Sequence, residues 1–129
     1  MDWERNKDKV MAKKSIRKEV VSLKKALKKA LKKALKKRNV PVKMLVLFGS
    51  HARDMATEHS DVDICVVCET GKIKDPKDLQ SRLNCDMGLA GINMDVIVTT
   101  YKDFKENMIS PILHEIRTYG KVLWPVVPQ

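Results

Sequence analysis

The chain has 129 residues, of which 43% are hydrophobic, a composition typical of one globular domain and not of a disordered segment. It holds no run of about 18 apolar residues, which excludes a membrane-spanning helix. The first residues are charged and lack the apolar run of a secretory signal, so we expect a cytoplasmic protein without a membrane partner. Its three cysteines are an odd number and do not suit a disulfide framework.

The formal net charge of +10 is concentrated near the N-terminus. Residues 1–40 hold 16 Lys and Arg against 4 Asp and Glu, whereas residues 41–129 hold 10 against 12. We therefore expect a basic, helical N-terminal extension over residues 1–40 and a separate, nearly neutral domain over residues 41–129. This asymmetry favours an acidic partner for the extension.

Residues 15–38 are predicted to form one long basic helix. The repeat Leu-Lys-Lys-Ala contains neither Gly nor Pro, and nearly every residue after Ser22 is a good helix former. The residue before Pro41 disfavours helical geometry, so the helix should end near residue 38 or 39. Alternating four- and three-residue spacings define one apolar face, which consists of Ile16, Val20, Leu23, Leu27, Ala30 and Ala34.

Three interpretations of this helix are open. The favoured one is a helix that packs its apolar side on a sheet and leaves its lysines in water. The second is an arm that contacts the phosphates of RNA or DNA, without sequence preference because no aromatic residues are interleaved with the lysines. The third is a helix that binds a partner or a second copy of the chain, since its 4-3 spacing resembles a short coiled-coil seam.

After this helix, apolar strands alternate with polar connections. Asp75 is the expected N-cap of a helix with Pro76 in its first position, and Gly88 and Gly91 are expected to close it. The expected elements are a buried strand over residues 42–48, a polar connection with a helical turn over 51–60, a strand over 61–67, a surface loop over 69–76, a helix from 76 to about 87 and a strand over 92–98.

Two short helices and an edge strand are expected to follow. Thr100 is the predicted N-cap of a helix over residues 101–108, and Ser110 with Pro111 begins a second helix through residue 117. Gly120 should stop that helix before an edge strand over residues 121–124. Strands that alternate with helices predict an α/β (α+β) fold in which helices flank one small sheet.

Three aspartates and a glycine turn are the candidate functional residues. Asp61 and Asp63 point to the same face of a strand, where two carboxylates repel each other unless a cation lies between them. Asp95 lies in an apolar strand, where a charge is costly without a partner, and a neighbouring strand would bring it to the same site. Carboxylate oxygens suit Mg²⁺. The Gly49-Ser50 turn can approach a phosphate closely and offer it a hydroxyl and an amide.

These residues form a recognisable pattern, Gly49-Ser50-His51-Ala52-Arg53 followed by Ser60-Asp61-Val62-Asp63-Ile64. It closely resembles the GSxAR…SDxD signature of the minimal nucleotidyltransferases, which belong to the DNA polymerase beta-like superfamily. The resemblance covers residues 42–124 approximately. It implies a mixed sheet flanked by helices, the nucleotidyltransferase fold, and two Mg²⁺ ions.

The resemblance also implies a role for each residue of the pattern. Asp61 and Asp63 would bridge both Mg²⁺ ions, and Asp95 would hold the catalytic one and help to activate the attacking hydroxyl. Gly49 and Ser50 would contact the β- and γ-phosphates of a nucleoside triphosphate, ATP or another, within a nucleotide-binding segment that includes Arg53 and Ser60. The reaction would be in-line attack on the α-phosphorus with pyrophosphate leaving.

One residue departs from the family pattern. The family usually has Gly after the Ala-Arg pair, where this chain has Asp54. Asp tolerates a left-handed backbone, so the turn can form, but its charge near a triphosphate is unfavourable unless it points away or pairs with Arg53. This substitution bears on nucleotide affinity and leaves the fold unaffected.

The resemblance implies that the protein transfers a nucleoside monophosphate, AMP from ATP, to a hydroxyl. In this family, short free-standing members commonly act as the antitoxin of a HEPN-domain ribonuclease toxin, modifying a toxin tyrosine and binding the toxin. An aminoglycoside-type small-molecule transferase is one alternative, although it would normally need an additional helical domain. The other alternative is a non-catalytic module that binds nucleotide, nucleic acid or a toxin. Whether the chain forms an oligomer is left open by the sequence.

Simpler interpretations stand beside these roles. The carboxylates can be water-exposed residues at strand starts or on an edge strand, Arg53 can position the turn, and Ser60 can be a capping hydroxyl. His51 and His59 lack ligand spacing and are interpreted as loop residues.

Cys65 and Cys68 have the CxxC spacing of a zinc or redox half-site. An odd separation on a strand, however, sends the two thiols to opposite faces, so we interpret both as buried side chains.

Overall fold

The computed structural model of the chain describes residues 25–50, 52, 53 and 61–125. Residues 25–37 form a helix, called the lysine helix below. The predicted helix over residues 15–38 is thus confirmed from residue 25 onward, and its earlier residues lie outside the described part of the chain. The other elements are β1 (Val42–Phe48), β2 (Val62–Cys68), α2 (Pro76–Leu89), β3 (Met94–Thr100), α3 (Tyr101–Glu106), α4 (Pro111–Tyr119) and β4 (Lys121–Trp124).

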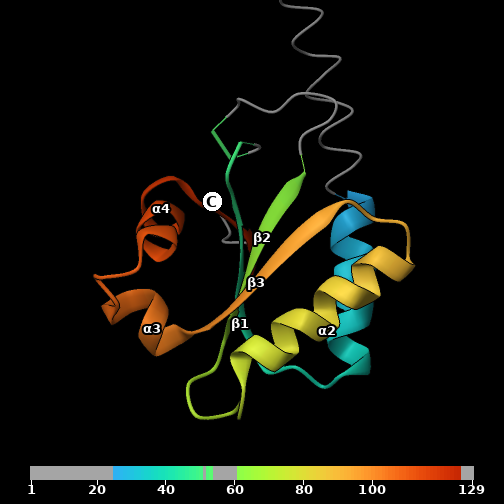
Figure 1. Ribbon diagram of the computed structural model, residues 1–129, viewed down its shortest axis with the longest axis horizontal. Coiled ribbons are helices and arrows are strands. Elements are labelled where there is room, and N and C mark those ends of the chain that lie inside the picture. Colours follow the sequence, from blue (N-terminus) through green and yellow to red (C-terminus); the bar gives the residue numbers. More distant parts are fainter. Residues whose placement is uncertain (1–24, 51, 54–60, 126–129) are drawn as a thin grey trace, which may run out of the picture.

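The strands form one sheet in the order β3-β2-β1-β4 (Figure 1). β1 runs antiparallel to both of its neighbours, β2 and β4, whereas β2 and β3 are parallel. Parallel neighbours need a crossover connection, and α2 provides it between β2 and β3. The small mixed sheet flanked by helices, the architecture expected from the sequence, is therefore confirmed.

Helices cover both faces of the sheet and bury two hydrophobic clusters. The lysine helix and α2 lie on one side of the sheet, and α3 and α4 lie on the other (Figure 1). The first cluster joins these two helices to alternate residues of β1, β2 and β3, among them Leu31, Leu83, Leu45, Ile64, Val66 and Val96. The second is smaller and consists of Val46, Phe48, Cys65, Val67, Leu113 and Ile116.

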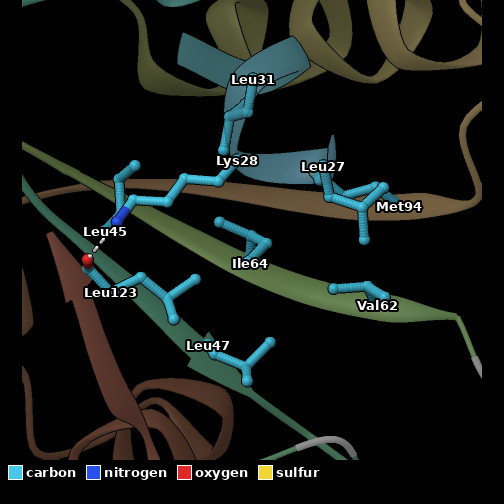
Figure 2. Close-up of a pocket in the computed structure, with 9 residues that line it drawn as sticks. All are labelled: Leu27, Lys28, Leu31, Leu45, Leu47, Val62, Ile64, Met94 and Leu123. Carbon is cyan, nitrogen blue, oxygen red and sulfur yellow. Dashed lines mark hydrogen bonds between the residues drawn. The ribbon is translucent and has the colours of Figure 1, made fainter. Parts of the chain in front are cut away.

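The lysine helix lies across the strands with one apolar side facing them (Figure 2). Leu27 and Leu31 are buried over the sheet, and Lys28 Nζ reaches past them to donate a 3.0 Å hydrogen bond to the carbonyl of Leu123 in β4. The favoured interpretation of the helix, apolar side packed and lysines largely in water, is confirmed for the described residues. The buried face differs in detail, because Leu31 and Leu35 are buried while Ala30 is only half-buried.

The lysine helix ends at a left-handed residue. Asn39 has φ 53°, and the Val40 amide donates to the Leu35 carbonyl at 3.0 Å, the pattern of a Schellman cap. The end near residues 38–39 was predicted from Pro41, but this cap is what terminates the helix. Arg38 then ties the end of the helix to α2, since its Nε and Nη2 donate to the two carboxylate oxygens of Asp86 at 2.7 and 2.9 Å.

The three predicted N-caps are confirmed. The side chain of Asp75 accepts from the Asp78 amide at the start of α2, and Pro76 occupies the first turn. Thr100 caps α3 and Ser110 caps α4 in the same way. Each side-chain oxygen satisfies one of the amides that the first turn of a helix leaves without a partner.

Several predicted boundaries were wrong by a few residues. α2 continues through Gly88 to Leu89, because Gly88 keeps helical geometry and the stop comes at Gly91, which has φ 71°. β2 spans Val62–Cys68 where residues 61–67 were expected. β3 begins at Met94 and not at residue 92, because the amide of Ile92 donates a hydrogen bond to the Met87 carbonyl and holds Ile92 in a turn. α3 stops at Glu106 and α4 extends to Tyr119, against predicted ends at residues 108 and 117.

The outer edge of β3 is covered by amide side chains of α2. The side chain of Asn84 donates to the carbonyl of Val96 at 2.9 Å and accepts from its amide at 2.8 Å, as a neighbouring strand residue would. The side chain of Gln80 accepts from the Val98 amide at 3.0 Å. Exposed strand edges invite pairing with other chains, so this cover protects β3 from edge-to-edge association.

Within the described ranges, no helix is both long enough and apolar enough to cross a membrane.

Candidate functional site

Asp63 and Asp95 are neighbours across the parallel pair β2 and β3. They are directly paired in the register, and side chains of paired residues in parallel strands point to the same face. Asp61 is the last residue before β2 and is exposed. The register therefore brings Asp95 beside Asp63, whereas the placement of the Asp61 carboxylate in the same site stays a prediction.

This face is the one that carries α3 and α4. Cys65, which follows Asp63 on the same side of β2, belongs to the cluster that packs on α4. Asp63 is half-buried, whereas Asp61 and Asp95 are exposed. The carboxylates thus lie where β2 and β3 begin and β1 ends, at the border between the smaller hydrophobic cluster and solvent.

Gly49 makes room for the carboxylate of Asp63. It follows β1, whose last residue Phe48 pairs with Asp63, and it has φ 73°. A Cβ built on Gly49 would overlap Asp63 Oδ2 and crowd the rest of the carboxylate. The position therefore requires glycine twice, for the left-handed backbone and for the close approach.

The turn after Gly49 contains Ser50, Ala52 and Arg53. The Arg53 amide donates to the Gly49 carbonyl at 3.2 Å and closes a turn that begins at Gly49. The helical turn predicted within residues 51–60 falls mostly outside the described residues. Ser50 is half-buried next to Gly49, and the small Ala52 is buried in the core. The backbone thus presents Ser50 beside the glycine that contacts Asp63.

The Arg53 side chain lies against α4. Its guanidinium carbon is 4.3 Å from the centre of the Tyr119 ring, the geometry of a cation–π contact. Tyr119 is 47% exposed, so the aromatic ring and the guanidinium form a partly open pair beside the turn. Sequence reasoning did not find Tyr119, because only the packing of α4 brings it to the turn.

The carboxylates match Mg²⁺ in donor chemistry, since hard cations take oxygen ligands. Within residues 25–50, 52, 53 and 61–125, however, the side chains do not form a group of three His, Cys, Asp or Glu that could hold a metal ion. Asp63 and Asp95 are nevertheless adjacent in register and on one face, and Gly49 leaves space beside Asp63. The residues therefore fit a divalent cation in donor type and strand position, and binding it would require their side chains to turn toward a common point.

Four residues discussed with the predicted site lie outside the described part of the chain: the loop residues His51 and His59, and Asp54 and Ser60. The predicted nucleotide-binding role of Ser60 and the effect of Asp54 in place of Gly stay predictions.

Cys65 and Cys68 are buried side chains, as predicted. Cys65 belongs to the cluster under α4 and Cys68 to the cluster under α2, so the two thiols lie on opposite faces of the sheet. Burial raises the pKa of Cys65 to about 12, with a further contribution from Cys68, and burial raises the pKa of Cys68 to about 11. Such thiols resist the deprotonation that metal binding and redox exchange need.

Comparisons with known proteins agree with this arrangement. A family model described as a nucleotidyltransferase domain matches residues 27–119. No curated protein matches the chain in sequence. Among solved structures, the fold is similar to that of a Sulfolobus solfataricus protein assigned as a nucleotidyltransferase, with a TM-score of 0.57 and 19% identity over 81% of each chain.

Two further solved structures are toxin–antitoxin proteins. One, crystallised with AMP-PNP, has a TM-score of 0.50 and 21% identity over 76% of this chain and 73% of that chain. The other, a mutant of the MntA–HpeT pair, has a TM-score of 0.48 and 22% identity over 85% of this chain and 72% of that chain. At these identities the similarity concerns the fold.

Proposed function

Because the chain belongs to the nucleotidyltransferase domain family, we propose that it transfers a nucleoside monophosphate, AMP from ATP, to a hydroxyl group with the help of Mg²⁺. The observation that carries this proposal is the register pairing of Asp63 with Asp95 beside the Gly49 turn. Two carboxylates on adjacent strands repel each other, and a divalent cation between them would offset that repulsion. The glycine turn supplies the open backbone that a phosphate needs next to such a cation.

Each residue has a proposed task. Asp61, Asp63 and Asp95 would hold two Mg²⁺ ions through their carboxylate oxygens, and the ions would supply positive charge to the attacking and leaving oxygens of the transfer. Gly49 and Ser50 lie along the β- and γ-phosphates. Asp95 takes the proton of the acceptor hydroxyl. The hydroxyl oxygen of the acceptor bonds to the α-phosphorus while the bond between the α-phosphorus and pyrophosphate breaks. Arg53 and Ser60 complete the nucleotide-binding segment.

The proposed acceptor is a tyrosine of a HEPN-domain toxin, which would make the protein an antitoxin. One structural neighbour is a toxin–antitoxin protein with AMP-PNP, which supports a nucleotide and a toxin as partners. The site lies at the end of the sheet where β2 and β3 begin, and Asp61 and Asp95 are exposed there. Exposed carboxylates suit a protein surface as acceptor better than a small molecule, which would need enclosing walls.

The position of the label in ATP tests the reaction. The full chain is incubated with Mg²⁺, a HEPN-domain toxin and ATP labelled either at the α- or at the γ-phosphorus. Transfer of AMP predicts label on the toxin from α-labelled ATP alone and loss of that label when the toxin tyrosine is changed to Phe. Label from γ-labelled ATP would indicate a kinase, and ATP binding without transfer would indicate a non-catalytic module; either result would overturn the proposal.

A further inference from the structure

A broad groove lies between the C-terminal half of the lysine helix and strands β1 and β4. Its volume is about 940 Å³. Its floor is apolar, with Val42 and Leu45 from β1 and Trp124 from the end of β4. Val42 and Trp124 are only half-buried, so the described chain leaves apolar surface uncovered here.

Four lysines form the rim of the groove: Lys29, Lys32, Lys33 and Lys36. All four are exposed, and no hydrogen bond or ion pair engages any of them within the described residues. Lys28, one position away from the rim, is by contrast bound to the Leu123 carbonyl. Among the residues that the structure describes, none that lines the groove is acidic. The groove thus combines an apolar floor with uncompensated positive charge.

The spacing of the rim indicates the shape of a partner. The four lysines lie three, one and three residues apart, which places them on one side of the helix in a row about 10 Å long. A second helix laid alongside would present its own residues at the same intervals. Acidic groups on such a helix could meet the lysines while its apolar residues cover the floor, as in helix-in-groove recognition.

We propose that this groove is the docking site for an acidic amphipathic helix of a partner protein. Nucleic acid is the other polyanion that a lysine row could attract, but the floor argues against it. Single-stranded nucleic acid is held by several aromatic platforms, whereas Trp124 is the one aromatic side chain that the described residues contribute to the groove. Aliphatic side chains such as Val42 and Leu45 stabilise apolar side chains and offer nothing to a phosphate backbone.

The docking groove and the carboxylate site lie on different sides of the sheet. Leu45 and the lysine helix belong to the larger cluster, whereas Asp63 and Asp95 point to the face of α3 and α4. A helix in the groove would therefore leave the carboxylates accessible. The proposal does not rest on nucleotidyl transfer, and it can hold or fail independently of it.

Trp124 provides a built-in reporter. The chain has two tryptophans, so Trp3→Phe leaves Trp124 as the single emitter in the full-length protein. The probe is a synthetic 21-residue helix with Leu at core spacing and Glu at the flanking positions. Titration should shift the Trp124 emission to shorter wavelength and saturate, and binding should weaken with salt. A peptide with Lys in place of Glu should not bind.

A charge-matched pair of variants tests the rim. Lys29→Glu, Lys32→Glu, Lys33→Glu and Lys36→Glu together should weaken peptide binding by about tenfold or more, because every rim contact becomes repulsive. The control changes four exposed lysines outside the groove by the same total charge: Lys72→Glu, Lys74→Glu, Lys77→Glu and Lys102→Glu. Circular dichroism checks that both variants fold. Equal binding by the two variants would overturn the proposal.

Two further outcomes would also contradict it. If a single-stranded RNA of equal charge shifts Trp124 and the acidic peptide does not, the groove binds nucleic acid. If the peptide binds only after removal of residues 126–129, the groove belongs to the chain's own C-terminal segment. Saturable binding of the acidic helix to the full chain, with lysine-dependent affinity, is the result that the proposal requires.

Discussion

Asp63 of β2 is paired with Asp95 of β3 in the parallel register, with both carboxylates on the face that carries α3 and α4. Neighbouring strands lie about 4.8 Å apart, so the register brings the backbones of the two aspartates close together. A divalent cation between their carboxylates would offset the repulsion of two like charges. The pairing is therefore the structural feature that supports the proposed metal-dependent reaction.

Gly49→Ala should destabilise the fold by about 1–3 kcal/mol, because alanine would adopt a left-handed backbone and its Cβ would overlap Asp63 Oδ2. Urea denaturation measures the loss. Gly71→Ala is the matched control, since Gly71 has a similar φ of 77° but open space around its Cβ position. Its loss should be smaller. Equal losses would show that the contact with Asp63 is not what requires glycine at residue 49.

Asn84→Ala should cost about 2–3 kcal/mol, because it removes two hydrogen bonds to Val96 and leaves an amide and a carbonyl of β3 without partners. Chemical denaturation measures the loss, and light scattering on concentration should report association through the uncovered edge. Ser81→Ala is the control on the same helix, since Ser81 is exposed and only its hydroxyl bonds to Lys77. Similar stabilities for the two variants would contradict the role given to Asn84.

One cysteine of three should react with a thiol reagent in the folded protein. Cys85 is exposed, whereas Cys65 and Cys68 are buried with pKa values raised to about 12 and about 11. Iodoacetamide at neutral pH followed by mass spectrometry should give one fast adduct, and denaturation should give three. Fast modification of Cys65 or Cys68 in the native state would mean that the central strand opens readily.

The ion pair of Arg38 and Asp86 should make stability depend on acid. The hydrogen bonds and charge of Arg38 lower the pKa of Asp86 below its ordinary value. The ionised carboxylate is therefore more stable in the folded state than in the unfolded state. The contribution of this ion pair to the free energy of unfolding is present above the ordinary carboxyl pKa of about 4. It is lost as the pH falls through the lowered pKa of Asp86.

Thermal melts of Asp86→Asn across pH test this sign. The variant should melt below the wild type at pH 7, and the gap should close in strong acid. Both partners are partly exposed to solvent, so the gap should be small and should shrink with added salt. If the difference in melting temperature persists unchanged below pH 3, it arises from lost packing and not from the ion pair.

Much of the fold could be predicted from local signals. Asp75, Thr100 and Ser110 each precede a helix and bond to its first turn, so capping chemistry located three helix starts. Helix and strand ends were less accurate, because they depend on contacts beyond the local pattern. Gly88, for example, keeps helical geometry within α2, and the glycine with a left-handed backbone is Gly91.

The candidate site could be predicted only as far as periodicity reaches. Alternation on a strand placed Asp61 and Asp63 on one face, and the pairing with Asp95 was expected if β3 lay beside β2, which the register confirms. The contact of Arg53 with Tyr119 and the cover of β3 by Asn84 depend on how α4 and α2 dock. Sequence spacing carries no signal for such contacts between distant segments.

The central claim is that Asp63 and Asp95 hold a divalent cation that in turn holds a nucleotide. The most direct test is calorimetric titration with a non-hydrolysable ATP analogue, with and without Mg²⁺, because it needs no acceptor. Binding should require Mg²⁺ and should weaken by about tenfold or more in Asp63→Asn and in Asp95→Asn. Asp103→Asn, at the exposed start of α3, should bind as the wild type does. Binding that is independent of Mg²⁺ and unchanged in both site variants would contradict the claim.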